Sequence, residues 1–213
     1  MKKASLVFAL VAALLLPALA AASPVNVQIL GTVEYNQVSI GQFGNVNPGD
    51  PVSVTFTLDT TMFLNSASFP TRGYVIDESS FTLTAGSATV HLRNPFPGVP
   101  YFVVRDNDPA VDGFFFSRGT DFPAGLPLDE AANGAGTRFF ESGFSVSYEG
   151  TRLPSLDILD AVGTYDLGGI GSFYFVILDL GFEPIGFIYD QMTISAPVSV
   201  ESESWAGVKA LFR

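Results

Sequence analysis

The stretch Asp50-Pro-Val-Ser-Val-Thr-Phe-Thr-Leu-Asp59 decides the fold class of this chain of 213 residues. Apolar and polar side chains alternate along it, with Val52, Val54, Phe56 and Leu58 separated by Ser53, Thr55 and Thr57. Successive side chains of a β-strand point to opposite faces, so this period of two buries one face and wets the other. The stretch therefore predicts a strand whose sheet covers a core.

The same alternation recurs at residues 81–84, 89–93 and 144–149. Further apolar runs that suit strands occupy residues 25–35, 101–105, 113–117, 172–180 and 185–195. Residues 172–180 (SFYFVILDL) are apolar on both faces, which predicts a central strand. Pro- and Gly-containing clusters at 47–50, 94–98 and 134–136 predict turns between such runs. About ten short strands with close turns predict an all-β fold, an antiparallel β-sandwich with jelly-roll-like topology.

One segment between these strands has two interpretations. Residues 156–162 suit either a single helical turn, with Ser155 as its cap, or a short strand. The sequence contains no long amphipathic helix inside the predicted domain, no internal repeat and no second domain. We therefore expect a single β-sandwich over residues 23–196.

The N-terminus has the three parts of a secretory signal peptide. Lys2 and Lys3 precede an unbroken apolar run from residue 6 to residue 16, and small residues follow at 18–22. The run is about 16 Å long as a helix, whereas a bilayer core is about 30 Å thick, so no stable membrane span is expected after cleavage. We expect residues 1–22 to direct export and the mature chain to begin near Ala21 or Ser23.

Composition narrows the possible partners of the mature chain. Without Lys2 and Lys3, eight basic residues face 21 acidic ones, a net charge near −13. Such an acidic surface repels nucleic acid and anionic lipid. Its charge serves either to keep the protein soluble or to bind cations. The chain has no cysteine, so its stability must come from burial and backbone pairing rather than disulfides. This favours a bacterial periplasmic, cell-surface or extracellular protein over a small eukaryotic secreted domain.

The sharpest local motif is Asp106-Asn-Asp-Pro-Ala-Val-Asp-Gly113. Asp106, Asp108 and Asp112 could converge on Ca²⁺, which takes six to eight oxygen ligands. The spacing differs from that of an EF-hand loop, because the third Asp comes at position seven. The alternative is an Asp-rich turn between two strands, since Asp and Asn form such turns readily.

Catalytic signatures are sparse. His91 is the only histidine and falls on the polar phase of a strand. With one histidine and no cysteine, the chain has few residues that could form a zinc site or a catalytic triad. A glycoside hydrolase would need two carboxylates that meet only in the fold. Candidates for such a pair are Asp77, Glu78, Asp129, Glu130 and Glu141. We therefore expect no enzymatic activity, with glycoside hydrolysis as the remaining catalytic option.

Glycan binding is the main functional alternative. β-Sandwiches bind sugars by stacking them on exposed aromatic rings. Residues 114–116 are three consecutive phenylalanines, so one ring must point away from its neighbours across the strand; Phe139 and Phe140 form a similar pair. If both faces of the sheet are covered there, these rings belong to a core instead.

Beyond the β domain, residues 197–204 (PVSVESES) suit an acidic linker and residues 205–213 (WAGVKALFR) a short amphipathic tail. Trp205, Val208 and Leu211 or Phe212 share one helical face, but nine residues are too few for a stable isolated helix. The tail either packs on the sandwich, is disordered, or is a sorting tag that uses Trp205, Lys209 and Arg213.

Several stretches together resemble a known group of proteins. Residues 31–35 (GTVEY), 49–61 (GDPVSVTFTLDTT) and 112–116 (DGFFF) follow an export signal. This pattern, over residues 25–195, resembles the uncharacterised β-sandwich ectodomains of bacterial exported proteins of the PEP-CTERM type. The chain has no Pro-Glu-Pro signal, no C-terminal apolar span and no terminal arginine cluster, so it departs from that group in its sorting region. The tail instead resembles short terminal tags of some exported bacterial proteins. The resemblance implies a cell-envelope or matrix context and no catalytic residues.

These observations predict a non-enzymatic exported component of the cell envelope, surface or extracellular matrix. The alternative is a carbohydrate-binding module or adhesin, with calcium at Asp106, Asp108 and Asp112 as a possible aid. Glycans or envelope and matrix components are the expected partners, and the sequence does not define the oligomeric state.

Overall fold

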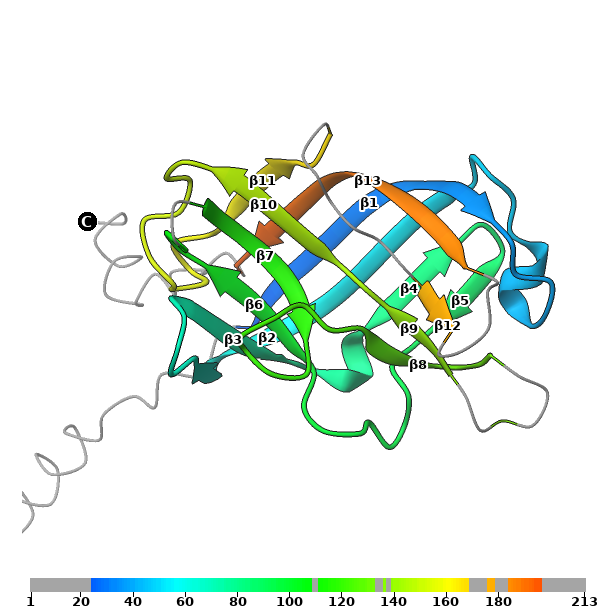
Figure 1. The fold of residues 1–213 in the computed structure, drawn as a ribbon, viewed down its shortest axis with the longest axis horizontal. Helices are drawn as coiled ribbons and strands as arrows, with labels where there is room; N and C mark the ends of the chain where they lie inside the picture. Colours follow the sequence, from blue (N-terminus) through cyan, green and yellow to red (C-terminus); the bar gives the residue numbers. More distant parts are fainter. Residues whose placement is uncertain are drawn as a thin grey trace, which may run out of the picture.

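The computed structural model describes residues 24–108, 111–132, 136, 139–168, 176–178 and 184–196. They form an all-β structure with two single-turn 3₁₀ helices (Figure 1). The strands are β1 (Val25–Asn36), β2 (Pro51–Asn65), β3 (Thr71–Ile76), β4 (Thr82–Ala85), β5 (Ala88–Val90), β6 (Tyr101–Arg105), β7 (Val111–Ser117), β8 (Leu126–Ala131), β9 (Phe139–Ser142), β10 (Ser145–Glu149), β11 (Gly163–Asp166), β12 (Val176–Leu178) and β13 (Ile185–Ser195). The 3₁₀ helices are η1 (Gln42–Asn45) and η2 (Glu78–Ser80).

Every strand pairing is antiparallel, and the strands join into one curled sheet with the order β10-β7-β6-β3-β2-β1-β13-β12-β9-β8. The sheet branches at two strands. β4 pairs with the first half of β2, and β11 pairs with the last part of β13. The prediction of an all-β, antiparallel, sandwich-like fold is confirmed. The described residues contain thirteen strands, against about ten expected.

The sheet curls back on itself through β9 and β10. Only Gly143 and Phe144 separate these strands, which read as one bent ribbon in Figure 1. One half of that ribbon pairs with β12 and the other with β7, so strands from both ends of the path share it. A bridge between Leu92 and Leu128 links β8 to the chain just after β5. The curled sheet therefore faces itself across a shared interior.

Phenylalanines dominate that interior. In β2, Val52, Val54, Phe56 and Leu58 are buried as the alternation predicts. Phe56 lies 5.4 Å from Phe102 and 5.5 Å from Phe116 between ring centroids, and Phe116 lies 5.4 Å from Phe144. Such distances suit the offset and edge contacts that aromatic rings prefer. Rings from β2, β6, β7 and the β9–β10 strand thus pack the two sides of the sheet together.

Residues 156–162 contain a single turn with successive i→i+3 hydrogen bonds, which matches the helical-turn alternative, and no strand. In this turn, Asp160 donates its N–H to the Asp157 carbonyl and Ala161 donates to that of Ile158. The Ser155 hydroxyl oxygen accepts the N–H of Asp157 at 2.9 Å, so Ser155 does stabilise this turn. Ile158 is buried in the core, which explains the apolar pattern. Of the predicted strand 172–180, only 176–178 is described, and it pairs on both sides, with β13 and β9.

Candidate functional site

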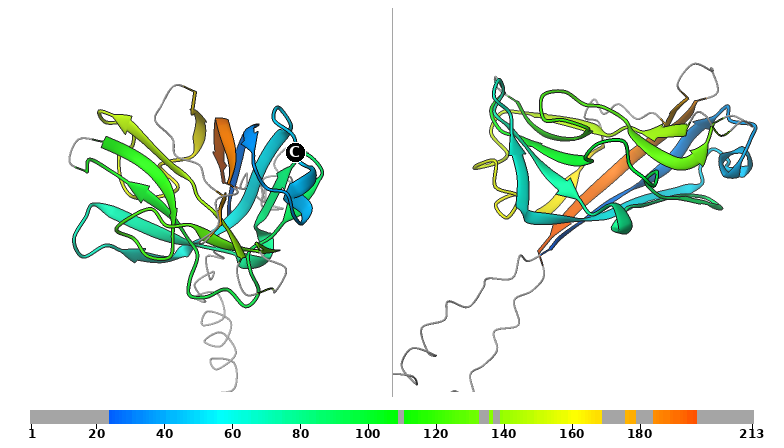
Figure 2. Two further views of the ribbon diagram at one scale, coloured as in Figure 1. Left: turned by 45° about the vertical axis from the view of Figure 1, so that its right-hand side comes forward. Right: turned by 90° about the horizontal axis from the view of Figure 1, so that it is seen from below.

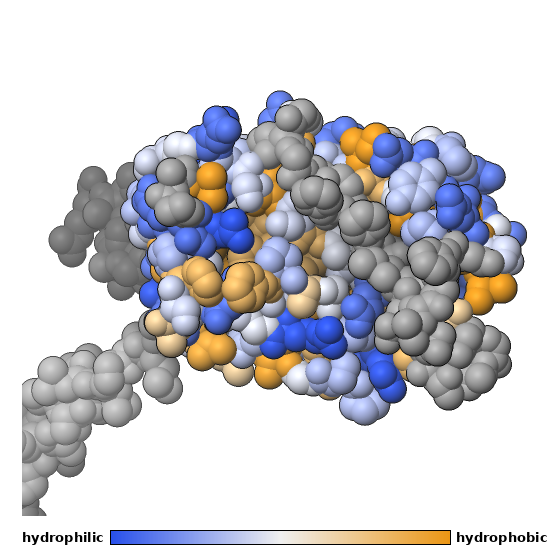
Figure 3. Space-filling view, viewed as in Figure 1, coloured by the Kyte–Doolittle hydropathy of each residue, from blue (hydrophilic) through white to orange (hydrophobic). Residues whose placement is uncertain are grey.

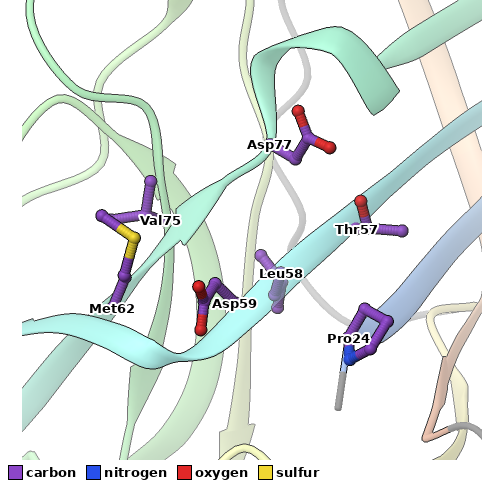
Figure 4. A pocket seen from close by; sticks show the side chains of 7 residues that line it. All are labelled: Pro24, Thr57, Leu58, Asp59, Met62, Val75 and Asp77. Atoms are coloured by element: carbon purple, nitrogen blue, oxygen red, sulfur yellow. The ribbon is translucent and has the colours of Figure 1, made fainter. Parts of the chain in front are cut away.

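A hollow that combines apolar and charged side chains lies on β2 and β3, where β2 carries a bulge. Leu58 pairs with Ile76 and Phe63 with Tyr74, so four residues of β2 stand opposite one residue of β3. A bulge bends its strand and re-aims the side chains within it. Here it creates a pocket of about 380 Å³, which we call the bulge pocket (Figure 4). Its lining residues are Pro24, Thr57, Leu58, Asp59, Met62, Val75 and Asp77.

Asp59 holds the bulge in shape. Its Oδ1 accepts the Thr61 hydroxyl at 2.6 Å and the Thr61 N–H at 2.8 Å. These hydrogen bonds, with the side-chain bond the stronger, lower the pKa of Asp59 below the ordinary aspartate value, because they favour the charged carboxylate. Asp59 is therefore ionised at neutral pH.

Asp77 provides the second carboxylate of the bulge pocket. It caps η2, where its Oδ1 accepts the Ser79 N–H at 3.0 Å and the Ser79 hydroxyl at 2.8 Å. Figure 4 shows Asp59 and Asp77 on opposite sides of Leu58, with Met62 and Val75 beside Asp59. Apolar side chains beside two carboxylates suit a ligand with both apolar and cationic groups.

A second, more polar hollow of about 410 Å³ adjoins the bulge pocket across β1, β2 and β13. The two hollows share Thr57. The second is lined mainly by hydroxyl and amide side chains, among them Asn26, Gln28, Thr55 and Thr193.

The predicted calcium loop is organised around Asp112. Asp112 is fully buried, and its Oδ1 accepts the Asn107 N–H at 2.8 Å. Its Oδ2 accepts the N–H of Leu153 at 2.6 Å and also that of Arg152. This carboxylate thus ties the loop after β6 to the segment after β10, and three of its roughly four lone-pair positions are occupied.

Asp106 and Asp108 have different surroundings. Partial burial, and then the charge of Asp112, raise the pKa of Asp106, while a hydrogen bond from the Asn107 amide opposes the rise. Asp108 faces Arg105, with 3.8 Å between Oδ2 and Nε. Among the described residues, no group of three His, Cys, Asp or Glu side chains could hold a metal ion. Calcium binding at Asp106, Asp108 and Asp112 therefore stays a prediction.

The consecutive phenylalanines are buried on both faces of β7. Phe114 and Phe116 belong to the main core, whereas Phe115 points the other way, beside its partner Val103 of β6. The Arg105 guanidinium lies 5.2 Å from the Phe115 ring centre. Phe140 is buried, and Phe139 is partly covered by Arg93 at 4.1 Å. The expectation that one of the three rings points away is correct, but that ring offers no exposed platform for a sugar.

A partly exposed aromatic pair lies elsewhere. Phe122 is 66% exposed, and its ring meets that of Phe69 edge-on at 5.2 Å between centroids. The Ser66 hydroxyl donates to Asp121 at 2.6 Å, which holds the two loops together. Sequence reasoning missed this pair, because its members are 53 positions apart in loops without periodicity.

His91 lies beside one of the candidate catalytic acids, and others of them have partners of their own. His91 is half-exposed and pairs with Asp129 at 3.4 Å. Glu130 accepts from the Gln42 backbone N–H and side chain, and Glu141 lies 3.9 Å from Arg118. Glu78 is exposed at η2, beside the Asp77 cap.

Other sequence predictions fall outside the described residues. These are the signal peptide at 1–22 and the tail residues Trp205, Lys209 and Arg213. Across the described part of the chain, no helix has the length and apolar character needed to cross a membrane. Comparisons with protein-family models, with curated proteins and with solved structures gave no match.

Proposed function

We propose that this chain is an exported, non-enzymatic component of the bacterial cell envelope, surface or extracellular matrix. The observation that carries the non-enzymatic part is the way its acidic side chains are used. Many of them accept backbone N–H groups at turns, caps and bulges, which is a structural role. They include Asp50, Asp59, Asp77, Asp112, Asp129, Glu130, Asp157 and Asp166.

Export rests on the sequence of residues 1–22. The surface agrees with a soluble role: on the face drawn in Figure 3, hydrophilic residues dominate the described part and hydrophobic ones form small groups. A net charge of −11 for the whole chain keeps such molecules apart in solution.

Cell fractionation tests this proposal. The full chain, expressed in a bacterial host, should appear in the periplasm, envelope or medium, with an N-terminus near Ala21 or Ser23. A matched chain that lacks residues 1–22 should stay in the cytoplasm. A full-length product that keeps residues 1–22 and remains cytoplasmic would overturn export.

A second candidate function, glycan binding, is favoured by the Phe69–Phe122 pair beside Asp121. An exposed ring, that of Phe122, next to a carboxylate matches the chemistry that sugars need. Affinity electrophoresis in gels that contain soluble polysaccharides should then show retardation that Phe122→Ala removes. Phe63→Ala, which changes an exposed ring outside the pair, is the control. Release of reducing ends from the same polysaccharides would contradict the non-enzymatic proposal.

A further inference from the structure

The bulge pocket lies at the end of the sandwich where the two ends of the described chain meet. Asn26 of β1 pairs with Ser195 of β13, and Val25 pairs with Leu58 of β2. Figure 2 shows the start of β1 and the end of β13 side by side. Pro24 lines the pocket itself, so a segment that continues from residue 196 starts close to it.

The distance is short enough for the C-terminal segment to reach the pocket. From β13 across β1 and β2 to β3 is three strand spacings, or about 15 Å at ~4.8 Å each. The linker at 197–204 has eight residues and spans up to about 26–29 Å when extended. Residues 205–213 can therefore lie over the bulge pocket without strain in the linker.

The chemistry of the tail complements that of the pocket. The tail carries Trp205 and further apolar residues together with Lys209 and Arg213. These two cations are a quarter of the eight basic residues that the mature chain is expected to keep. The bulge pocket has the complementary groups: the apolar side chains of Met62 and Val75, and the carboxylates of Asp59 and Asp77 beside them. Met62 is 54% exposed, so its side chain is available for such a contact.

We propose that residues 205–213 of the same chain occupy the bulge pocket. Trp205 and the apolar residues of the tail cover Met62, Val75 and the edge of Leu58. Lys209 and Arg213 approach Asp59 and Asp77. A tail on a short linker has an effective concentration in the millimolar range, so even a contact of millimolar affinity is about half-populated. This inference does not depend on export or on glycan binding.

Trp205 is the only tryptophan in the chain and reports directly on this contact. The chain from residue 23 to residue 213 contains the whole described sandwich and the tail. Its tryptophan emission should be blue-shifted and quenched several-fold less by acrylamide than in the urea-unfolded chain.

Met62→Asp places a third acid in the bulge pocket and should move both readouts toward their unfolded values. Ile188→Asp is the matched control, because Ile188 is also an exposed apolar strand residue, at 43%, but lies on β13 about seven residues from Ser195. Lys209→Glu combined with Arg213→Glu should release the tail in the same way without any change in the sandwich. Urea unfolding followed by circular dichroism confirms that each variant remains folded.

Three results would overturn the proposal. One is a Trp205 that is as accessible in the native chain as in the unfolded chain. Another is shielding that survives Met62→Asp, which would show that the tail packs elsewhere. The third is shielding that disappears on dilution, which would make a second copy the occupant.

Discussion

At the scale of single residues, Asp112 has the largest predicted effect on stability. A buried carboxylate that accepts three backbone N–H groups leaves all three without partners when it is removed. Each lost partner of this kind costs about 1–3 kcal/mol, so Asp112→Ala should destabilise the fold by about 3 kcal/mol or more. Urea unfolding measures this difference. Asp108→Ala, which removes only a partly exposed ion pair, should cost less than about 1 kcal/mol; equal costs for the two variants would contradict the assigned role.

The same residue leads to a prediction about calcium. Because backbone donors already occupy most of the Asp112 lone pairs, calcium and chelator should give the same thermal midpoint. A ligand at a hundred times its dissociation constant would add about 2.7 kcal/mol, which a melting curve resolves easily. A rise in the midpoint with calcium that Asp108→Ala removes would show that the loop rearranges into a metal site.

Asp59 makes the stability contribution of the bulge pH-dependent. Its pKa is lowered in the folded chain, so the charged form stabilises the fold above the ordinary value of 3.8. That stabilisation is lost as the pH falls through the lowered folded pKa. Wild type should therefore exceed Asp59→Asn in stability at pH 7, by less than about 1 kcal/mol for so exposed a group, and the two should converge in acid. Paired urea titrations at pH 7 and near pH 3 test this, and an unchanged gap would exclude the mechanism.

At the scale of elements, Gly113 sets how closely β7 and β10 approach. A Cβ at Gly113 would fall on the backbone carbonyl oxygen of Val146, which cannot move without the strand. Gly113→Ala should therefore cost about 1–3 kcal/mol, as overpacking does. Gly163→Ala in β11 is the control, since open space surrounds that position and loss of glycine flexibility alone stabilises by about 0.4–1 kcal/mol. Opposite signs in the two melting-point shifts are expected; a stabilised Gly113→Ala would refute the close approach.

The strands that the sequence predicted are those with a clear period or a long apolar run. β6 and β13 have the predicted bounds, and β2 buries the predicted face. β3, β8, β9 and β11 were not predicted, because they are short and hold Gly73, Pro127 or acidic residues that hide the pattern. Their pairing comes from neighbours distant in sequence, and so do the bulge pocket and the Phe69–Phe122 pair.

The motif at 106–113 predicts an Asp-rich turn. The burial of Asp112, however, depends on the N–H groups of Arg152 and Leu153, which no local pattern reveals.

At the scale of the whole molecule, we expect formation of the sheet to depend on β13. It pairs with β1, β11 and β12, and its longest ladder joins residues at opposite ends of the described chain. A chain that ends at residue 184 would expose the apolar inner face of β1 and should show no cooperative urea transition. A chain that ends at residue 196 keeps every described strand and should unfold cooperatively. Because the β1–β13 ladder needs β13, the sheet should form only after residues 185–195 are available. Circular dichroism of the two truncated chains is the measurement, and a cooperative transition in the shorter one would show that β1 finds its stability without β13.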